Sequence, residues 1–228
     1  MIVFVHIPKT AGTALGQAFD YATGRRVFWD YDRQYRFAEK IQPEIRDNIG
    51  FIASYFEMIY GHFFVTKYMT LLPDARYFSC VRHPVQRTIS QYYHAGSDSG
   101  TWPGDKIASG EMNVLDFARI DMIGSAQTLH LAGMDLKDLD HLFITERLNA
   151  SVAMFHKKHG SKYHLSVPQF NTRAQRELST SEGQSKETSK IIEVTEDDKQ
   201  QLFALCRQDV DLYRRAVEIH IAEVAKLS

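Results

Sequence analysis

The sequence has little of several features that mark particular protein classes. It contains only two cysteines, Cys80 and Cys206, far apart in the chain. They lack metal or redox spacing, so we expect reduced thiols, with a structural disulfide as the less favoured alternative. No run of about 18 apolar residues is present, which predicts no membrane span. The first residues lack a basic start and a small-residue cleavage site, so we expect no secretory signal and a cytoplasmic protein.

An excess of charge of either sign is also missing. Twenty-seven basic and 28 acidic residues leave a formal net charge of −1. A surface that coats nucleic acid needs a large positive field, so we expect no nucleic-acid partner, although a local basic pocket is compatible with this balance. The 44% apolar and 24% charged residues are typical of a globular protein. The length predicts a single domain over residues 1–228 with insertions; it does not indicate the oligomeric state.

Two strand–turn–helix units dominate the local pattern. Residues 2–7 form an apolar run without polar alternation, which is typical of a strand buried on both faces, and a helix is expected over 14–21. Residues 76–81 repeat the strand pattern, and Pro84 then suits the first turn of a helix reaching about residue 94. Repeated strand–turn–helix units predict an α/β fold with a central parallel sheet flanked by helices.

The remaining segments give weaker patterns. Helical patterns occur at residues 63–72, 113–122 and 148–159 and from about 195, and a third strand is expected at 142–145. We interpret 27–40 as a loop running into a helix and 97–110 as a flexible surface loop. Residues 179–190 are polar and low in complexity, which indicates either disorder or a lid that orders on ligand binding.

The loop after the first strand is the most informative segment. It reads HIPKTAGT, and a loop between a buried strand and a helix directs backbone N–H groups outward, where the helix dipole adds positive potential. Lys9 adds a full charge, Thr10 and Thr13 add hydroxyls, and Gly12 allows close backbone approach. Together with Ala11 these residues predict an anion site sized for a phosphate. The alternative is an ordinary turn with a surface lysine.

This loop is not a Walker A motif. The motif requires a lysine followed by serine or threonine after its last glycine, whereas Lys9 precedes Gly12. The hydroxyl that normally binds magnesium is therefore not in its usual place.

A second anion-binding pattern follows the other strand. Arg82 stands directly after it, and Ser90 lies eight residues further along the expected helix. Arginine at a strand end can make two charge-assisted hydrogen bonds to a phosphate, and a serine two helical turns later can add a third. Taken singly, Arg82 would more often form a surface salt bridge and Ser90 would be a small packing residue.

His62 is the candidate base. It lies in the stretch IYGHFF, between the two anion-binding patterns. An imidazole with an ordinary pKa of about 6.5 is largely neutral at pH 7 and can accept a proton from a hydroxyl. The chain has ten histidines, so a hydrogen-bonded structural role is the alternative.

Taken together, PKTAGT after an apolar strand, the Arg82–Ser90 spacing and the Gly-His stretch resemble the sulfotransferases that use 3′-phosphoadenosine 5′-phosphosulfate (PAPS). The likeness is greatest to the carbohydrate group typified by heparan sulfate 2-O-sulfotransferase. That group often has serine where this chain has Gly12, and an acidic or amide residue where it has His83. The resemblance implies a P-loop-like three-layer fold and transfer of a sulfuryl group to a hydroxyl of a carbohydrate or glycan-like acceptor, without a metal.

The resemblance also implies roles for the residues. The loop from Thr10 to Thr13 would bind the 5′-phosphate, Arg82 and Ser90 the 3′-phosphate, and Lys9 and His62 would be catalytic. Two alternatives remain open at this point: a P-loop kinase of a small molecule, and a nucleotide-binding protein without turnover. Four aromatic residues could stack on a sugar ring but are expected to serve packing first: Trp29, Tyr31, Tyr35 and Trp102.

Overall fold

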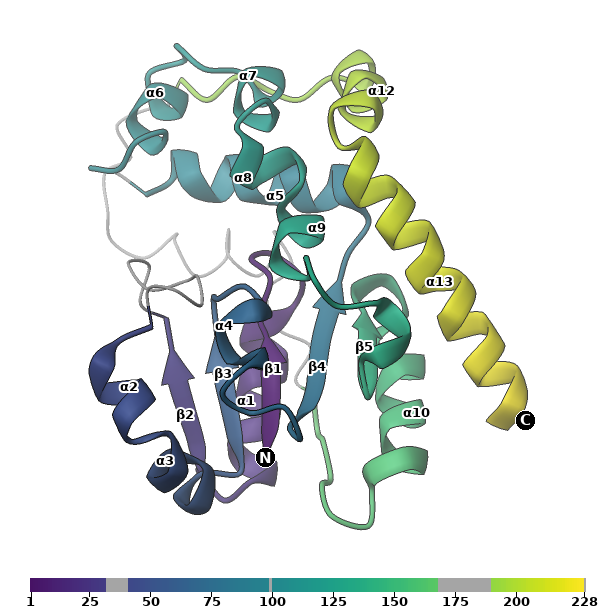
Figure 1. The fold of residues 1–228 in the computed structure, drawn as a ribbon. Coiled ribbons are helices and arrows are strands. Elements are labelled where there is room, and N and C mark those ends of the chain that lie inside the picture. The colour runs from purple at the N-terminus through teal and green to yellow at the C-terminus, as the bar shows by residue number, and fades with distance from the viewer. Residues whose placement is uncertain (32–40, 99, 168–189, 228) are drawn as a thin grey trace, which may run out of the picture.

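The computed structural model describes residues 1–31, 41–98, 100–167 and 190–227, and its centre is a five-stranded parallel sheet (Figure 1). The order is β2-β3-β1-β4-β5. The strands are β1 (Ile2–Val5), β2 (Val27–Asp30), β3 (Met58–Gly61), β4 (Arg76–Val81) and β5 (His141–Ile144). The register places Val5 opposite Gly61 and Ser79. The segments that follow β1, β3 and β4 therefore begin at one edge of the sheet.

Helices cover both faces of this sheet. One face packs on α1 (Gly12–Ala22) and α10 (Leu148–His159), through Phe4 of β1 and Phe155 of α10. The helices of the other face are α2 (Pro43–Asp47), α3 (Ile49–Tyr55), α4 (Thr66–Met69) and α13 (Arg207–Leu227). They pack against side chains of β1 such as Val3 and Val5. The predicted α/β fold with three layers is confirmed.

A further group of short helices lies beyond the carboxyl edge of the strands (Figure 1). It comprises α5 (Pro84–Gly96), α6 (Gly104–Ala108), α7 (Val114–Ala118), α8 (Asp121–Gly124), α9 (Ala126–His130) and α12 (Glu196–Leu205). The 3₁₀ turns η2 (Leu136–Asp138) and η3 (Thr145–Arg147) flank β5. Tyr92, Phe117 and Leu202 form a separate small core here. This group covers the sheet edge where the strand ends converge.

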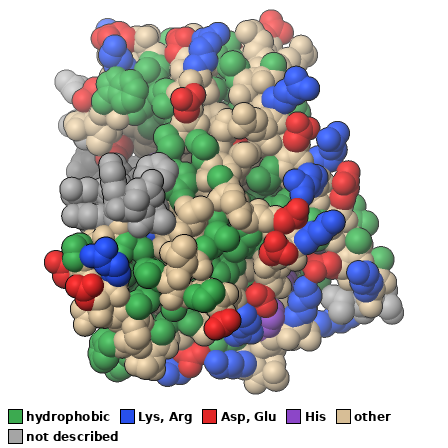
Figure 2. Space-filling view, in the orientation of Figure 1, with side chains coloured by type: hydrophobic (Ala, Val, Ile, Leu, Met, Phe, Trp, Pro, Cys, Tyr) green, Lys and Arg blue, Asp and Glu red, His purple; other side chains and the backbone are tan. Residues whose placement is uncertain are grey.

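Two further observations concern the charge on one face of the surface and the length of the described helices. On the face shown in Figure 2, acidic and basic side chains are interspersed, as the balanced composition predicts. Within the described ranges, no helix is both long enough and apolar enough to cross a bilayer.

Several sequence predictions about the elements were wrong. Strands β2 and β3 were not predicted, because neither segment shows a clear apolar period. The helix expected over 63–72 is reduced to α4, and the one expected over 113–122 is two short helices. The predicted surface loop 97–110 contains α6. The segment 179–190 lies outside the described residues, except for Lys190.

The C-terminal helix is also divided. Helix α12 begins at Glu196, close to the predicted start, and Thr195 caps it: its hydroxyl accepts from Asp198 N–H, and the Asp198 carboxylate accepts from Thr195 N–H. The helix then ends at Leu205 with Cys206 as its C-cap, and α13 begins at Arg207. Toward the C-terminus of α13, the apolar side chains of Ile221 and Val224 are exposed.

Candidate active site

A cavity of about 810 Å³ lies at the carboxyl edge of the sheet, beneath the group of short helices. Ligands of open α/β sheets bind at this edge, where the strand order reverses. Here the chain builds β2 and β3 on one side of β1, and β4 and β5 on the other. All but one of the predicted site residues line this cavity: Lys9, Ala11, Gly12, Thr13, His62, Arg82 and Ser90.

The loop between β1 and α1 turns its backbone toward the cavity. Lys9 and Ala11 both adopt left-handed backbone conformations, with φ of 72° and 64°. Ala11 is the N-cap of α1 and supplies no side-chain cap. The first N–H groups of a helix have no partner within it, and the helix dipole makes this end positive. The loop therefore presents uncapped N–H groups of α1 beside the lysine.

Thr10 is the one predicted site residue that does not line the cavity. Its side chain is fully buried, and its hydroxyl donates a hydrogen bond of 2.8 Å to the carbonyl of Ile7. The expectation that this hydroxyl would face the anion is therefore wrong. The hydroxyl instead closes the loop on itself, while the hydroxyl-bearing Thr13 is exposed.

Gly12 is required by its contact with His6. A Cβ added at position 12 would lie 1.8 Å from Nε2 of His6, far inside van der Waals contact. The group typified by heparan sulfate 2-O-sulfotransferase often has serine here, and a serine side chain would not fit beside this imidazole. Glycine at position 12, where the heparan sulfate 2-O-sulfotransferase group often has serine, is therefore explained by the imidazole of His6.

Arg82 is fixed from two sides. Its guanidinium donates a hydrogen bond of 3.2 Å to the Lys9 carbonyl. The side-chain amide of Gln127 accepts from Arg82 N–H at 2.8 Å and donates to its carbonyl at 3.0 Å. Buried Asp209 in turn accepts from the backbone N–H groups of Gln127 and Thr128. A chain of hydrogen bonds from α13 thus positions the arginine.

Ser90 lies half-buried on α5, and a second arginine precedes it by one turn. Arg87 also lines the cavity and is only 1% exposed. Its guanidinium donates to the Ile123 carbonyl and to the Thr88 hydroxyl. Burial lowers the pKa of Arg87 from its ordinary value. Sequence reasoning missed this residue, although the three-residue spacing to Ser90 on one helix was the available signal.

His62 follows β3 and is held by main-chain groups. Its backbone N–H donates to the Asp30 carbonyl at 3.0 Å. Its Nδ1 lies 2.6 Å from the carbonyl oxygen of His6. A carbonyl only accepts, so Nδ1 carries the proton, and in the neutral ring Nε2 holds the lone pair. The ring of Tyr31 packs edge-on against the imidazole of His62, with 4.8 Å between the ring centroids.

The carboxylate of Glu146 lies next to His83, the residue that follows Arg82. His83 stands where the resembling group has an acidic or amide residue, and its backbone N–H donates to Glu146 at 2.9 Å. The other oxygen of Glu146 accepts from the hydroxyl of Tyr213 at 3.0 Å. Glu146 follows β5, so tertiary structure supplies a carboxylate that the local sequence lacks.

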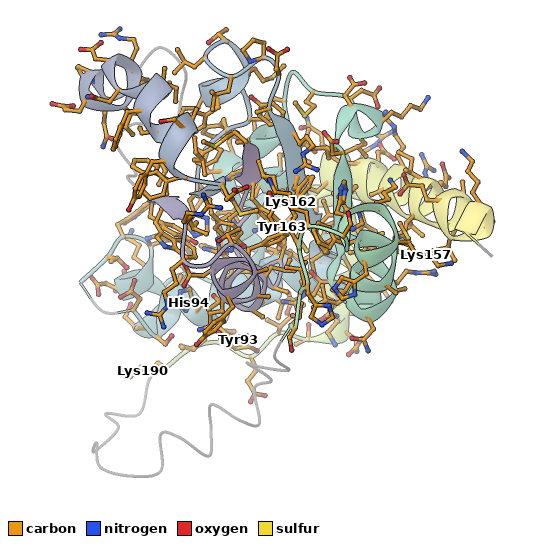
Figure 3. The ribbon with its side chains drawn as sticks, turned by 90° about the horizontal axis from the view of Figure 1, so that it is seen from below. Tyr93, His94, Lys157, Lys162, Tyr163 and Lys190 are labelled. Carbon is orange, nitrogen blue, oxygen red and sulfur yellow. The ribbon has the colours of Figure 1, made fainter. Side chains whose placement is uncertain are left out.

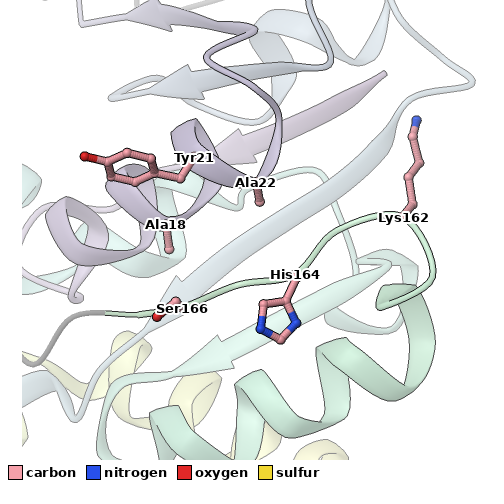
Figure 4. A pocket seen from close by; sticks show the side chains of 6 residues that line it. All are labelled: Ala18, Tyr21, Ala22, Lys162, His164 and Ser166. Carbon is pink, nitrogen blue, oxygen red and sulfur yellow. The ribbon is translucent and has the colours of Figure 1, made fainter.

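A second hollow of about 570 Å³ lies elsewhere, between α1 and residues 162–166 (Figure 4). Its lining residues are Ala18, Tyr21, Ala22, Lys162, His164 and Ser166, none of which belongs to the predicted site. On another side of the molecule, the backbone N–H of Lys190 donates to the Ala108 carbonyl at 3.0 Å; Lys190, Tyr93 and His94 are labelled in Figure 3. The Val194 N–H donates to the Tyr93 hydroxyl at 3.2 Å.

The fold and the cavity define an α/β protein with a helix N-terminus, a lysine, two arginines and a histidine around one site, an arrangement suited to group transfer from an anionic donor. The sequence matches the model of the Sulfotransferase family over residues 1–214. The chain therefore belongs to the sulfotransferase family, and the expected class of enzyme, a sulfotransferase, is confirmed. This family membership contradicts the alternative of a P-loop kinase.

Two solved structures are similar to this one. Mouse sulfotransferase SULT7A1 complexed with PAP has 11% identity and a TM-score of 0.48, covering 97% of this chain and 88% of that chain. A sulfotransferase from Alicyclobacillus acidocaldarius has 14% identity and a TM-score of 0.42, covering 93% and 98%. No curated protein matches the sequence.

Proposed function

We propose that this sulfotransferase moves the sulfuryl group of PAPS to a hydroxyl of a carbohydrate or glycan-like acceptor, as in the group typified by heparan sulfate 2-O-sulfotransferase. One observation carries the proposal: Lys9, His62, Arg82 and Ser90 line a single cavity although they come from four separate segments. Its volume of about 810 Å³ lies within the range of cofactor pockets.

The donor is held at its two phosphorylated ends. The backbone of residues 10–13 at the start of α1 binds the 5′-phosphate, and Arg82 and Ser90 bind the 3′-phosphate. The guanidinium of Arg82 has five N–H donors, and the bond to the Lys9 carbonyl uses one of them. Further N–H groups are left for a phosphate, and the Gln127 amide holds the backbone of Arg82 in place.

His62 acts as the general base. Its Nε2 accepts the proton of the acceptor hydroxyl while that oxygen attacks sulfur, and the bond from sulfur to the phosphate oxygen breaks. The Nδ1–H bond to the His6 carbonyl steadies the imidazolium that forms. Lys9 offsets the negative charge that grows on the bridging oxygen as adenosine 3′,5′-bisphosphate leaves. Positioning and charge stabilisation supply most of the rate in such transfers.

Exposed aromatic rings support a carbohydrate as the acceptor. Trp29 and Tyr31 are 44% and 39% exposed, and their rings stack with 6.1 Å between the centroids. Tyr31 also contacts the ring of His62. Trp102 is 67% exposed and lines the cavity. Flat rings with a polar edge suit ligands that combine apolar faces with hydroxyls.

The test combines turnover with binding. We expect His62→Ala to lower the rate constant of transfer by about 10²–10⁴-fold, the contribution of a general base. Isothermal titration with adenosine 3′,5′-bisphosphate should show affinity within about twofold of the parent. His164→Ala, an exposed histidine outside the cavity, is the matched control. Full turnover in His62→Ala would overturn the base assignment, and equal affinity for ADP would overturn the assignment of the 3′-phosphate site.

A further inference from the structure

The imidazole of His6 takes no part in the reaction as proposed above, which uses only its carbonyl. This side chain lines the cavity and is only 6% exposed. It follows β1 and is the first residue of the loop HIPKTAGT. Its ring centroid lies 4.2 Å from that of His62. His6 therefore stands between the loop and the base.

Nε2 of His6 is directed over the start of α1. The Cβ that Gly12 lacks would lie 1.8 Å from this nitrogen. Within the described part of the chain, the hydrogen bond of the His6 ring is made through the other nitrogen, Nδ1, with the hydroxyl of Tyr31 at 3.0 Å. A nine-tenths buried imidazole thus directs an unbonded nitrogen to the helix N-terminus that borders the cavity.

The surroundings of the ring define its charge and its tautomer. Burial, with His62, His130 and Lys9 nearby, holds the pKa of His6 well below its ordinary value, so the ring is neutral. Burial also raises the pKa of Tyr31, which keeps its hydroxyl protonated. When that hydroxyl donates to Nδ1, the ring proton resides on Nε2.

We propose that His6 is a further donor-binding residue, whose Nε2–H donates a hydrogen bond to the sulfuryl group of PAPS. The inference rests on the proposed function. If the 5′-phosphate occupies the backbone of residues 10–13, the sulfuryl group extends from it toward His62, and His6 lies between the two. A neutral donor suits this place, since a second imidazolium would oppose protonation of His62.

The experiment compares PAPS with adenosine 3′,5′-bisphosphate, which lacks the sulfuryl group. Dissociation constants are measured without acceptor for the parent, His6→Leu and His6→Gln. We expect His6→Leu to weaken PAPS binding about 10- to 100-fold, the range for a hydrogen bond to a charged group, and bisphosphate binding by less than about twofold. His6→Gln, whose amide nitrogen reaches the position of Nε2, should retain most of the PAPS affinity.

Tyr31→Phe provides a second variant that leaves the His6 side chain in place. It keeps the aromatic ring against both histidines and removes only the hydroxyl. We expect a loss of PAPS affinity of about three- to tenfold with unchanged bisphosphate affinity, because the proton is no longer fixed on Nε2. This variant decides the matter if His6→Leu does not fold.

Either of two results would overturn this inference and leave the proposed function standing. In the first, His6→Leu weakens the binding of PAPS and of the bisphosphate equally, which would mean that His6 only supports the loop. In the second, PAPS affinity is unchanged in both His6→Leu and Tyr31→Phe. If the parent chain binds neither ligand, the proposed function itself falls and this inference falls with it.

Discussion

The guanidinium of Arg82 donates a hydrogen bond of 3.2 Å to the backbone carbonyl of Lys9, 73 residues earlier in the chain. This bond joins the segments that leave two neighbouring strands, β1 and β4. The two anion-binding patterns of the sequence therefore meet at one cavity. A donor molecule with two phosphorylated ends is the ligand that would use both.

Replacing Arg82 by alanine should weaken the binding of adenosine 3′,5′-bisphosphate by about 1.5–3 kcal/mol, since hydrogen bonds to a charged partner are lost. Binding of ADP should change less, because ADP has no 3′-phosphate. Calorimetric titration of both ligands measures the difference. Arg119→Ala, an exposed arginine paired with Asp116, is the control and should bind like the parent. Equal losses for the two nucleotides would contradict the prediction.

Gly12→Ala should destabilise the protein by about 1–3 kcal/mol, the usual cost of overpacking. The reason is the overlap of the new Cβ with the His6 ring. His6→Ala in the same chain removes the obstruction, so the double variant should recover part of the loss caused by Gly12→Ala. Denaturant unfolding of the two single variants and the double variant gives the coupling energy. Additive losses would show that the two positions do not interact.

Lys67→Met should destabilise the protein by about 3–5 kcal/mol, because it leaves the buried carboxylate of Asp30 without its cation. The side chains of Lys67 and Asp30 are 0% and 1% exposed, and Nζ of the lysine lies 2.6 Å from Oδ2 of the aspartate. The Asp30 carbonyl also accepts the backbone N–H of His62, so the pair supports the base. Adding Asp30→Asn should reduce the loss, since it removes the unpaired charge. Urea unfolding measures all three proteins, and a single variant as stable as the parent would contradict this account.

Glu57 should make the stability depend on acid pH. Hydrogen bonds from Lys162 and Tyr163 lower its pKa from 4.5 to about 2. A carboxyl with a lowered pKa in the folded state stabilises the fold above pH 4.5 and loses this contribution as the pH falls toward about 2. With Lys162 and Arg26 half-exposed, we expect about 1–2 kcal/mol.

The measurement is urea unfolding of Glu57→Gln and the parent at neutral and acid pH. The variant should be less stable at pH 7, and the difference should shrink in acid. Glu196→Gln, whose side chain is 83% exposed beside Lys199, is the control and should change stability by less than about 0.5 kcal/mol. A difference for Glu57→Gln that does not vary with pH would contradict the prediction.

Much of the fold could be predicted from local patterns. β4 and α10 have the predicted bounds, and β1, α1 and α5 differ from prediction by one or two residues at an end. These elements carry strong local patterns of apolar residues or helix starts. β2 and β3 were missed, because neither segment shows a clear apolar period and both are stabilised as strands by their neighbours in the sheet.

The sequence by itself determined which chemical groups the site contains. Lys9, Gly12, His62 and Arg82 stand in or beside turns at strand ends and helix starts, and Ser90 lies on the helix that follows Arg82. Such local elements depend on residues close together in the chain.

Only the tertiary structure decided how these groups are oriented and supported. The proton on Nδ1 of His62 and the hydrogen bonds between Gln127 and Arg82 both depend on which groups lie nearby in the folded chain. Some of these partners are dozens of residues away in sequence. Hydrogen bonding and burial follow distance in space, so patterns of neighbouring residues do not contain this information.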